Sequence, residues 1–272
     1  MALSVPAGGL IGWRFLQRTM DRQVETIAAQ PLAVRELQHL REALPKAATV
    51  DDFLGDRMLT RSVLTAFGLE SERNKTALLR KILVEGTESP QAMARRMADR
   101  RFENFARALG YGNSGGAQVG QAGLADKIAG DYVARRVELA ASETDPALRL
   151  ALNFKREIAA VAQSPGAAQA GWYQVMGNQP LRQVIEAAFG LPSQSAQLDL
   201  EDQKRLFERK AQNMFGEPTV GAFLEPANVN RAIEIYLLRD GATRPPAAPI
   251  LQLFQSSPAI SPLSLLLSRG QI

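Results

Sequence analysis

Four segments of the chain repeat the same pattern of apolar and polar positions. The segments start at Asp56, Asp99, Asn178 and Pro226, and in each of them apolar residues stand three, seven and ten positions further along. This is the spacing of an α-helix that buries one face, so we predict four helices built on one helical template. The template predicts burial of eight side chains in particular: Leu59, Val63, Phe102, Leu109, Leu181, Ile185, Val229 and Ile233.

Shared helix ends extend the similarity between these segments. Glycine follows three of them, at positions 68, 110 and 190, where a helix end favours the left-handed conformation. The segments TVDDFL (49–54) and TVGAFL (219–224) lie 170 residues apart without a gap, and Thr49 and Thr219 are predicted to cap short helices. AFGL occurs at 66–69 and again at 188–191. Two explanations stay open for these matches: duplication of a helical unit, and the resemblance that amphipathic helices show to one another by default.

The remaining chain is predicted to be helical between breaks. Residues 1–12 are rich in glycine and proline and are predicted to be loose, and the next two helices, 13–30 and 34–44, could form an antiparallel pair. A helix is predicted to restart at Ser89-Pro90, because proline is tolerated in a first turn. Further helices are predicted at 74–85, 124–141, 145–163, 171–191 and 200–215.

Glycine and proline divide the chain into four parts. Residues 112–123 contain five glycines in twelve residues, which predicts a flexible linker or a surface loop between an N-terminal helical half (1–111) and a C-terminal half (124–240). From 241 to 272, prolines interrupt short apolar runs and exclude a continuous helix. We therefore predict an all-α protein, an array of short helices in a duplicated multi-helix unit, with an irregular proline-rich C-terminal tail.

Composition narrows the chemistry further. The chain has no cysteine and one histidine, His39, so neither disulfides nor a histidine metal site are expected. The net charge is +4 with 32 cations and 28 anions, which indicates a mixed surface and gives little support to nucleic-acid binding. No run approaches the roughly 20 apolar residues of a membrane helix, and the N-terminus lacks the basic and apolar regions of a cleaved secretory signal.

No motif in the chain predicts catalysis, a cofactor or a metal. The glycines of 112–123 do not match a dinucleotide or phosphate-loop pattern, and a serine hydrolase would need a histidine close to Ser114. His39 is predicted to be a surface or half-buried polar residue. Asp51 and Asp52 are predicted to lie in the first turn of a helix, where negative charge suits the helix dipole.

Two groups of residues are candidates for contact with a partner. Arg95, Arg96 and Arg100 form a local cationic cluster, and the nearby Phe102 and Phe105 belong to the apolar stripe and are predicted to be core. The arginines are therefore expected to contact Glu72, Glu85 or Glu103, or a protein partner. In the tail, apolar side chains should seek a groove, and we name three as candidate contacts: Leu251, Phe254 and Leu265.

A series of short motifs resembles a bacterial family catalogued as domain of unknown function 1217. The motifs, in order, are GWRFLQRT (12–19), VDDFL (50–54), AFGL (66–69), RKxLxEG (80–86), ADxRF (98–102), RLALxF (149–154) and AFGLP (188–192). The resemblance covers roughly residues 12–240. It implies an all-helical protein that is associated with the flagellum of motile alphaproteobacteria, with no established activity and no catalytic residues.

We therefore expect a non-enzymatic, flagellum-associated structural or assembly protein that acts through protein–protein contacts, located in the cytoplasm or at the flagellum. Its expected partners are flagellar proteins, without membrane insertion. One alternative is a basic helical protein that binds nucleic acid or acts as a regulatory protein. Another is an enzyme that uses carboxylates in a cleft between the two halves.

Overall fold

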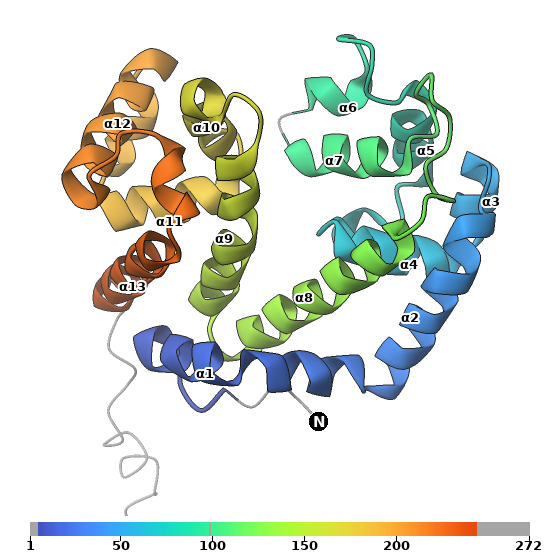
Figure 1. Cartoon of the computed structure of the whole chain (residues 1–272), viewed down its shortest axis with the longest axis horizontal. Helices are drawn as coiled ribbons and strands as arrows, with labels where there is room; N and C mark the ends of the chain where they lie inside the picture. Colours follow the sequence, from blue (N-terminus) through green and yellow to red (C-terminus); the bar gives the residue numbers. More distant parts are fainter. Residues whose placement is uncertain (1–4, 98, 244–272) are drawn as a thin grey trace, which may run out of the picture.

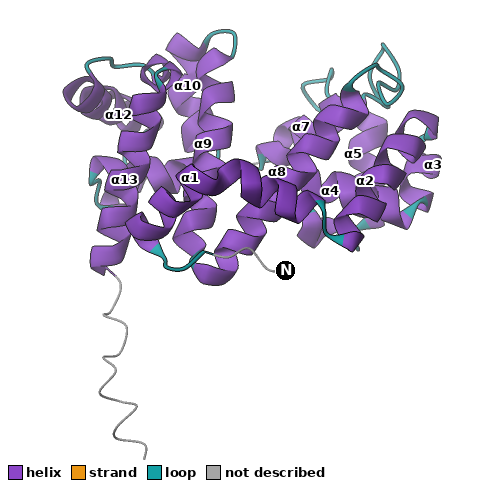
Figure 2. Ribbon diagram, turned by 60° about the horizontal axis from the view of Figure 1, so that its bottom comes forward, coloured by secondary structure: helices purple, strands orange, loops and turns teal. Residues whose placement is uncertain are grey.

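The computed structural model describes residues 5–97 and 99–243, and over these residues the chain is all-helical, with no strand (Figures 1 and 2). The α-helices are α1 (Gly9–Ala28), α2 (Pro31–Ala43), α3 (Val50–Gly55), α4 (Arg57–Ala66), α5 (Thr76–Glu85), α6 (Met93–Arg96), α7 (Arg100–Leu109), α8 (Leu124–Thr144), α9 (Pro146–Gln163), α10 (Ala167–Met176), α11 (Gln179–Phe189), α12 (Leu200–Phe215) and α13 (Pro226–Thr243). Short 3₁₀-helices are η1 (Leu44–Lys46), η2 (Glu70–Glu72), η3 (Ser193–Gln197) and η4 (Val220–Leu224).

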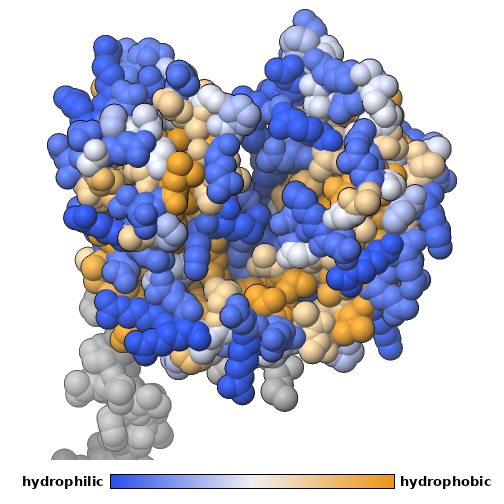
Figure 3. Space-filling view, viewed as in Figure 1, coloured by the Kyte–Doolittle hydropathy of each residue, from blue (hydrophilic) through white to orange (hydrophobic). Residues whose placement is uncertain are grey.

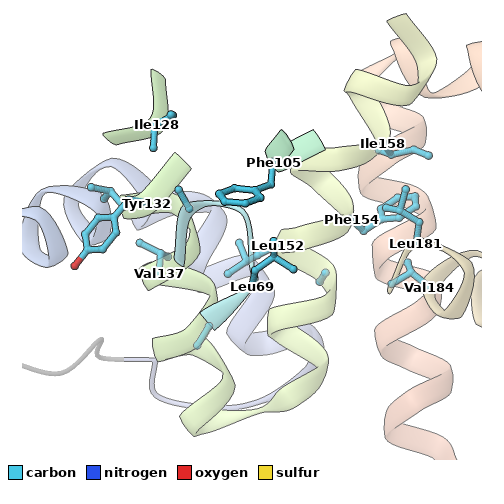
Figure 4. Packing of buried hydrophobic residues seen from close by; sticks show 14 of the residues in the cluster. Leu69, Phe105, Ile128, Tyr132, Val137, Leu152, Phe154, Ile158, Leu181 and Val184 are labelled. Atoms are coloured by element: carbon cyan, nitrogen blue, oxygen red, sulfur yellow. The ribbon is translucent and has the colours of Figure 1, made fainter. Parts of the chain in front are cut away.

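The helices form two lobes that are joined by α1, α8 and α9 (Figure 1). In the first lobe α4 packs on α2 and α8, and in the second α11 and α13 pack on each other and on α9. Helix contacts cross the boundary predicted at 112–123, and the division into two halves stays a prediction. Helix α1, from the predicted N-terminal half, packs on α13, while α8, from the predicted C-terminal half, packs on α4 and α2. Buried apolar residues accordingly form one continuous cluster through both lobes (Figure 4).

The template prediction of buried positions is confirmed, since all eight side chains are buried. The side chains of Asp56, Asp99 and Asn178 each accept a backbone N–H bond from the first turn of α4, α7 and α11, so the anchors are N-caps. The fourth helix starts one position earlier in the template, because Pro226 is its first residue. The side chains of Thr49 and Thr219 cap α3 and η4 as predicted. Duplication of the unit stays a prediction.

The first two helices differ from the prediction. Helix α1 begins at Gly9 rather than near residue 13, because the backbone N–H of Gly9 donates to a carboxylate oxygen of Asp145 at 2.7 Å. The prediction that α1 and α2 could form an antiparallel pair is wrong. The two helices diverge at Pro31, and the apolar side of α1 faces α8, α9 and α13 instead (Figure 1). In α2 the buried residues include Leu37 and Leu40, whereas Val34 is exposed.

The helix predicted to restart at Ser89-Pro90 is also shorter than expected. The backbone N–H of Ala92 donates to the carbonyl of Ser89 at 3.0 Å, which closes a turn there. Helix α6 starts only at Met93, whose backbone N–H donates to the Glu85 carboxylate at 2.6 Å. A carboxylate from the end of α5 therefore decides where α6 begins.

Of the two forms predicted for the glycine-rich segment 112–123, a linker or a surface loop, the structure has the loop, and it is packed against its neighbours. The side-chain oxygen of Asn113 accepts the backbone N–H of Thr87 at 2.8 Å, and the hydroxyl of Ser114 donates to Glu88 at 2.8 Å. Just before the loop, the hydroxyl of Tyr111 donates to the carbonyl of Ala47 at 2.6 Å. The loop is thus held against the end of α5 and the start of α3.

Two glycines of this loop should respond oppositely to the same substitution. A Cβ on Gly112 would lie no more than 2.7 Å from three backbone atoms, which belong to Leu83, Val84 and Gly86. A Cβ on Gly120 would meet nothing within 4 Å. Gly112→Ala should therefore lower the free energy of unfolding by about 1–3 kcal/mol through overpacking.

Gly120→Ala is the matched control, and it should raise the free energy of unfolding by about 0.4–1 kcal/mol, because alanine restricts the unfolded chain. Urea denaturation of both variants at neutral pH measures the difference. Equal effects at the two positions would show that the loop yields freely, as a linker would.

Candidate interaction surface

The predicted arginine cluster lies on the outer side of α6 and the start of α7. Arg95, Arg96 and Arg100 are all exposed. Arg100 forms an ion pair with Glu103 at 2.7 Å, and Arg95 donates to the carbonyl of Glu88 at 3.4 Å. Within the part of the chain that the structure describes, Arg96 forms no hydrogen bond or ion pair. Arg95 and Arg96 therefore present positive charge to solvent, and neither pairs with a carboxylate of residues 5–97 or 99–243.

The phenylalanines beside this cluster belong to the core, as predicted. Phe102 and Phe105 are buried, and the ring of Phe105 packs against Phe53 and Phe67 at centroid distances of 6.0 and 5.6 Å. Proteins that bind single-stranded nucleic acid generally combine cations with exposed aromatic rings on which bases stack. These two rings are not available for stacking.

Of the three carboxylates predicted to contact the arginines, only one does so. The nearly buried Glu103 accepts from both Arg100 and Arg107. Glu72 pairs instead with Lys75, which stands three residues further along in the turn before α5, at 2.9 Å. Glu85 caps α6 and lies 3.8 Å from Lys81. The three tail residues predicted as contacts, Leu251, Phe254 and Leu265, lie outside the described residues.

His39 is half-buried, as predicted, and its Nε2 lies 2.6 Å from a carboxylate oxygen of Asp56. Burial alone would raise the pKa of Asp56, but the backbone N–H of Leu59 and the contact with His39 hold that pKa below its usual range. The pair borders a surface pocket of about 340 Å³, which is also lined by Lys46 and Asp52. The carboxylate of Asp56 therefore caps α4 and pairs with His39.

The paired carboxylates Asp51 and Asp52 lie in the first turn of α3, as predicted. Asp52 completes a capping box with Thr49, and Asp51 forms an ion pair with Arg80 at 2.6 Å. Both carboxylates are therefore accounted for by helix capping and ion pairing.

A buried ionic network at the junction of the lobes was not predicted. Arg135 of α8 donates to Glu138 at 2.9 Å and to Glu70, after α4, at 3.0 Å. Glu138 also accepts from Arg156 of α9 at 2.9 Å. The side chains of Arg135 and Glu138 are only 5% and 3% exposed, so both charges depend on these partners. The network ties η2, α8 and α9 together.

A second buried network joins α8 to α2 and α4. The carboxylate of Glu36 accepts from the hydroxyl of Tyr132 and pairs with Arg61. Arg136 donates to the same hydroxyl at 3.1 Å. Burial, together with the hydrogen bond to Glu36, raises the pKa of Tyr132. A run of charged residues in the middle of a predicted helix is the sequence feature that accompanies this network. Such a run is equally typical of a helix face exposed to solvent, so it does not predict a buried network.

The remaining surface features of the described residues bring together fewer interacting charged groups. A surface groove of about 450 Å³ follows α12 and is lined by Leu198, Leu206 and four charged residues. No group of three or more histidine, aspartate or glutamate side chains among residues 5–97 and 99–243 is arranged to hold a metal ion. None of the described helices combines the length and the apolar character needed to span a bilayer.

Comparisons with known proteins place the chain in a family. Residues 66–229 match the model of a family described as "Protein of unknown function (DUF1217)", which confirms the predicted family. The match does not reach the motifs at 12–19 and 50–54, which were predicted to belong to it. The structure is similar to the crystal structure of protein AGR_C_984 from Agrobacterium tumefaciens, with a TM-score of 0.70 and 24% sequence identity. The similarity covers 86% of this chain and 93% of that one, and it shows a shared fold. No match was found among curated proteins.

Proposed function

The chain belongs to the family described as protein of unknown function (DUF1217), and on that premise we propose that it is a non-enzymatic, flagellum-associated protein. It takes part in flagellar structure or assembly by binding other proteins. The association with the flagellum rests on the motif resemblance, which implies it for this family.

One observation on the molecule supports binding to proteins rather than catalysis. Arg95 and Arg96 stand exposed on α6 without a carboxylate partner in the described chain, while the aromatic residues beside them are buried. Arginine is enriched at protein interfaces, because its planar guanidinium group binds carboxylates through two parallel hydrogen bonds. This cationic edge therefore fits an acidic surface of a partner protein.

Deletion of the gene in its motile host tests the proposed function. We expect reduced swimming in soft agar and, by electron microscopy, missing or shortened filaments, hooks or basal bodies. Expression of the intact chain from a plasmid should restore all of these. A deletion strain with normal swimming and normal flagella would contradict the proposal.

The cationic edge is tested in the same strain. Complementation with the double variant Arg95→Glu, Arg96→Glu should fail, because charge reversal replaces attraction to an acidic partner with repulsion. The matched control is Arg18→Glu, Arg22→Glu on α1, where two exposed arginines one turn apart form no side-chain hydrogen bond or ion pair with any described residue. Restoration of swimming by the α6 variant, at equal protein level, would exclude this edge as the contact.

The alternative function, nucleic-acid binding, predicts a different result. With a modest net charge and buried phenylalanines, the protein should bind duplex and single-stranded DNA no more tightly than micromolar at physiological salt. Titration by fluorescence anisotropy measures this. A nanomolar complex that depends on base sequence would favour the alternative.

A further inference from the structure

One buried carboxylate holds the starts of two helices at the corner where α8 ends and α9 begins. The side chain of Asp145 accepts the backbone N–H of Ala147, in the first turn of α9, at 2.9 Å. It also accepts the backbone N–H of Gly9, in the first turn of α1, at 2.7 Å. Asp145 is 2% exposed, so water competes little for its oxygen atoms. Since Gly9 is 136 residues away in the chain, this carboxylate fastens α1 to the corner.

The start of α1 lies so close to this corner that side chains would not fit between them. A Cβ on Gly8 would lie 2.6 Å from the carboxylate oxygen Oδ2 of Asp145. A Cβ on Gly12 would lie 3.0 Å from Cδ1 of Leu148, in the first turn of α9. Both distances are too short for an unstrained non-bonded contact. An alanine at position 8 would therefore displace the start of α1 from the corner.

Helix α1 is tied to both lobes along its length. In its first half, the side chain of Gln17 donates to the side chain of Asn230 on α13 at 2.8 Å. Just beyond its last residue, the side chain of Gln30 accepts from Arg136 of α8 at 3.3 Å. The two ends of α1 are thus bonded to helices that belong to different lobes.

The position of α1 matters because of where the lobes meet. Figures 1 and 2 show α1 lying across the corner between α8 and α9. From that corner α8 and α9 diverge as the two arms of a V, and each arm packs in a different lobe (Figure 1). The molecular surface is hollowed between the lobes (Figure 3). A change in the angle of the V would change the width of this hollow and would require α1 to slide along α8 or α13.

Directional bonds, rather than apolar burial, fix the place of α1 along the corner. Trp13 and Leu16 are fully buried and keep α1 on the body of the protein, but apolar burial has no preferred direction. The ion pair between Arg14 and Glu234 of α13 is long, at 3.8 Å, and its side chains are 60% and 38% exposed, so solvent screens it. The buried bond from Gly9 to Asp145 therefore contributes most to the register of α1.

We propose that α1 is a strap that sets the separation of the two lobes, and that Asp145 is the positioning residue that anchors it. Loss of the bond between Asp145 and Gly9 frees the first turn of α1, and the angle between α8 and α9 then varies. Neither lobe unfolds, because α4 still packs on α2 and α8, and α11 still packs on α13 and α9. The strap thereby controls access to the hollow between the lobes. This inference does not depend on the flagellar function.

The distance between the lobes reports the state of the strap. The chain has no cysteine, so Asn104→Cys on α7 and Ala168→Cys on α10, both at exposed positions, allow one spin label on each lobe of the full chain. Double electron–electron resonance should give one narrow distance distribution. Gly8→Ala displaces the start of α1 but keeps the cap of α9, and it should at least double the width of that distribution. Asp145→Ala should do the same.

Two matched controls change a glycine and a helix cap elsewhere. A Cβ on Gly130 of α8 would meet nothing within 4 Å. Asp199 accepts the backbone N–H of Asp202 at 2.8 Å and caps α12, which lies at the far end of the second lobe from α1 (Figure 1). Gly130→Ala and Asp199→Ala should keep the distance distribution of the unaltered chain. Circular dichroism and thermal unfolding show which variants remain folded.

A substitution away from the corner keeps the test decisive if the variants at the corner fail to fold. Gln17→Ala removes the bond to Asn230 and leaves the Asp145 carboxylate in place, so it should broaden the distribution to a smaller extent. Unchanged distributions in every folded variant among Gly8→Ala, Asp145→Ala and Gln17→Ala would overturn the strap. Equal broadening in the two controls would also overturn it, because any loss of stability would then have the same effect.

Discussion

Glu138→Gln should lower the free energy of unfolding by about 3–5 kcal/mol, the range found when one partner of a buried ion pair is removed. The carboxylate of Glu138 accepts from Arg135 and Arg156 at 2.9 Å each, and its side chain is 3% exposed. The neutral amide has nearly the same shape, so little packing is lost. The main effect is that the buried charge of Arg135 then depends on Glu70 alone.

Glu157→Gln is the control, because Glu157 also accepts from Arg156, at 2.7 Å, while its side chain is 29% exposed. Solvent screens that pair, so the same substitution should cost about 0–1 kcal/mol. Chemical denaturation of both variants at neutral pH, with the unaltered chain alongside, gives the comparison. Equal small losses at the two positions would mean that water reaches the buried network and that it does not hold α8 to α9.

Phe102→Ala should lower the free energy of unfolding by about 3–5 kcal/mol, the usual cost of truncating a buried phenylalanine. Phe102 occupies the first apolar position of the template in α7 and is 4% exposed. Removal of the ring loses its burial and leaves a cavity that the surrounding helices close only in part. Phe102→Leu, which keeps most of the volume, should cost distinctly less.

Asn104→Ala on the same helix is the matched control. Asn104 is exposed, and alanine is the better helix former, so this change should stay within about 0.5 kcal/mol of the unaltered chain. Thermal or urea denaturation of the three variants orders them. A loss below about 1 kcal/mol for Phe102→Ala would show that burial at the template positions contributes little to stability.

The helices show most clearly how much of the structure can be predicted from the sequence. The template in α4, α7, α11 and α13 depends on apolar spacing within ten residues, and the caps at Asp56, Asp99 and Asn178 depend on bonds to backbone atoms two or three residues away. Such interactions involve residues close in the chain, so spacing and residue type suffice to predict them. The burial of Phe102 and Phe105 followed from the same stripe.

The tertiary structure decided everything that depends on distant partners. Asp145 fixes the start of α1 from 136 residues away, and Asn113 binds Thr87 across 26 residues, which turns a glycine-rich segment into a packed loop. Helix α1 was expected to pair with its neighbour α2 and packs instead on α8, α9 and α13. Apolar stripes predict that a face is buried, but they carry no information on which face covers it.

The candidate sites divide in the same way. Arg95, Arg96 and Arg100 could be proposed from the sequence, because they are neighbours in it and their exposure follows from the adjoining stripe. The buried network around Glu138 could not, since its charges come from η2, α8 and α9. By itself, the sequence determined most of the helices and the burial of the template side chains. Only the folded chain decided which charges meet, because an ion pair between distant helices depends on how those helices pack.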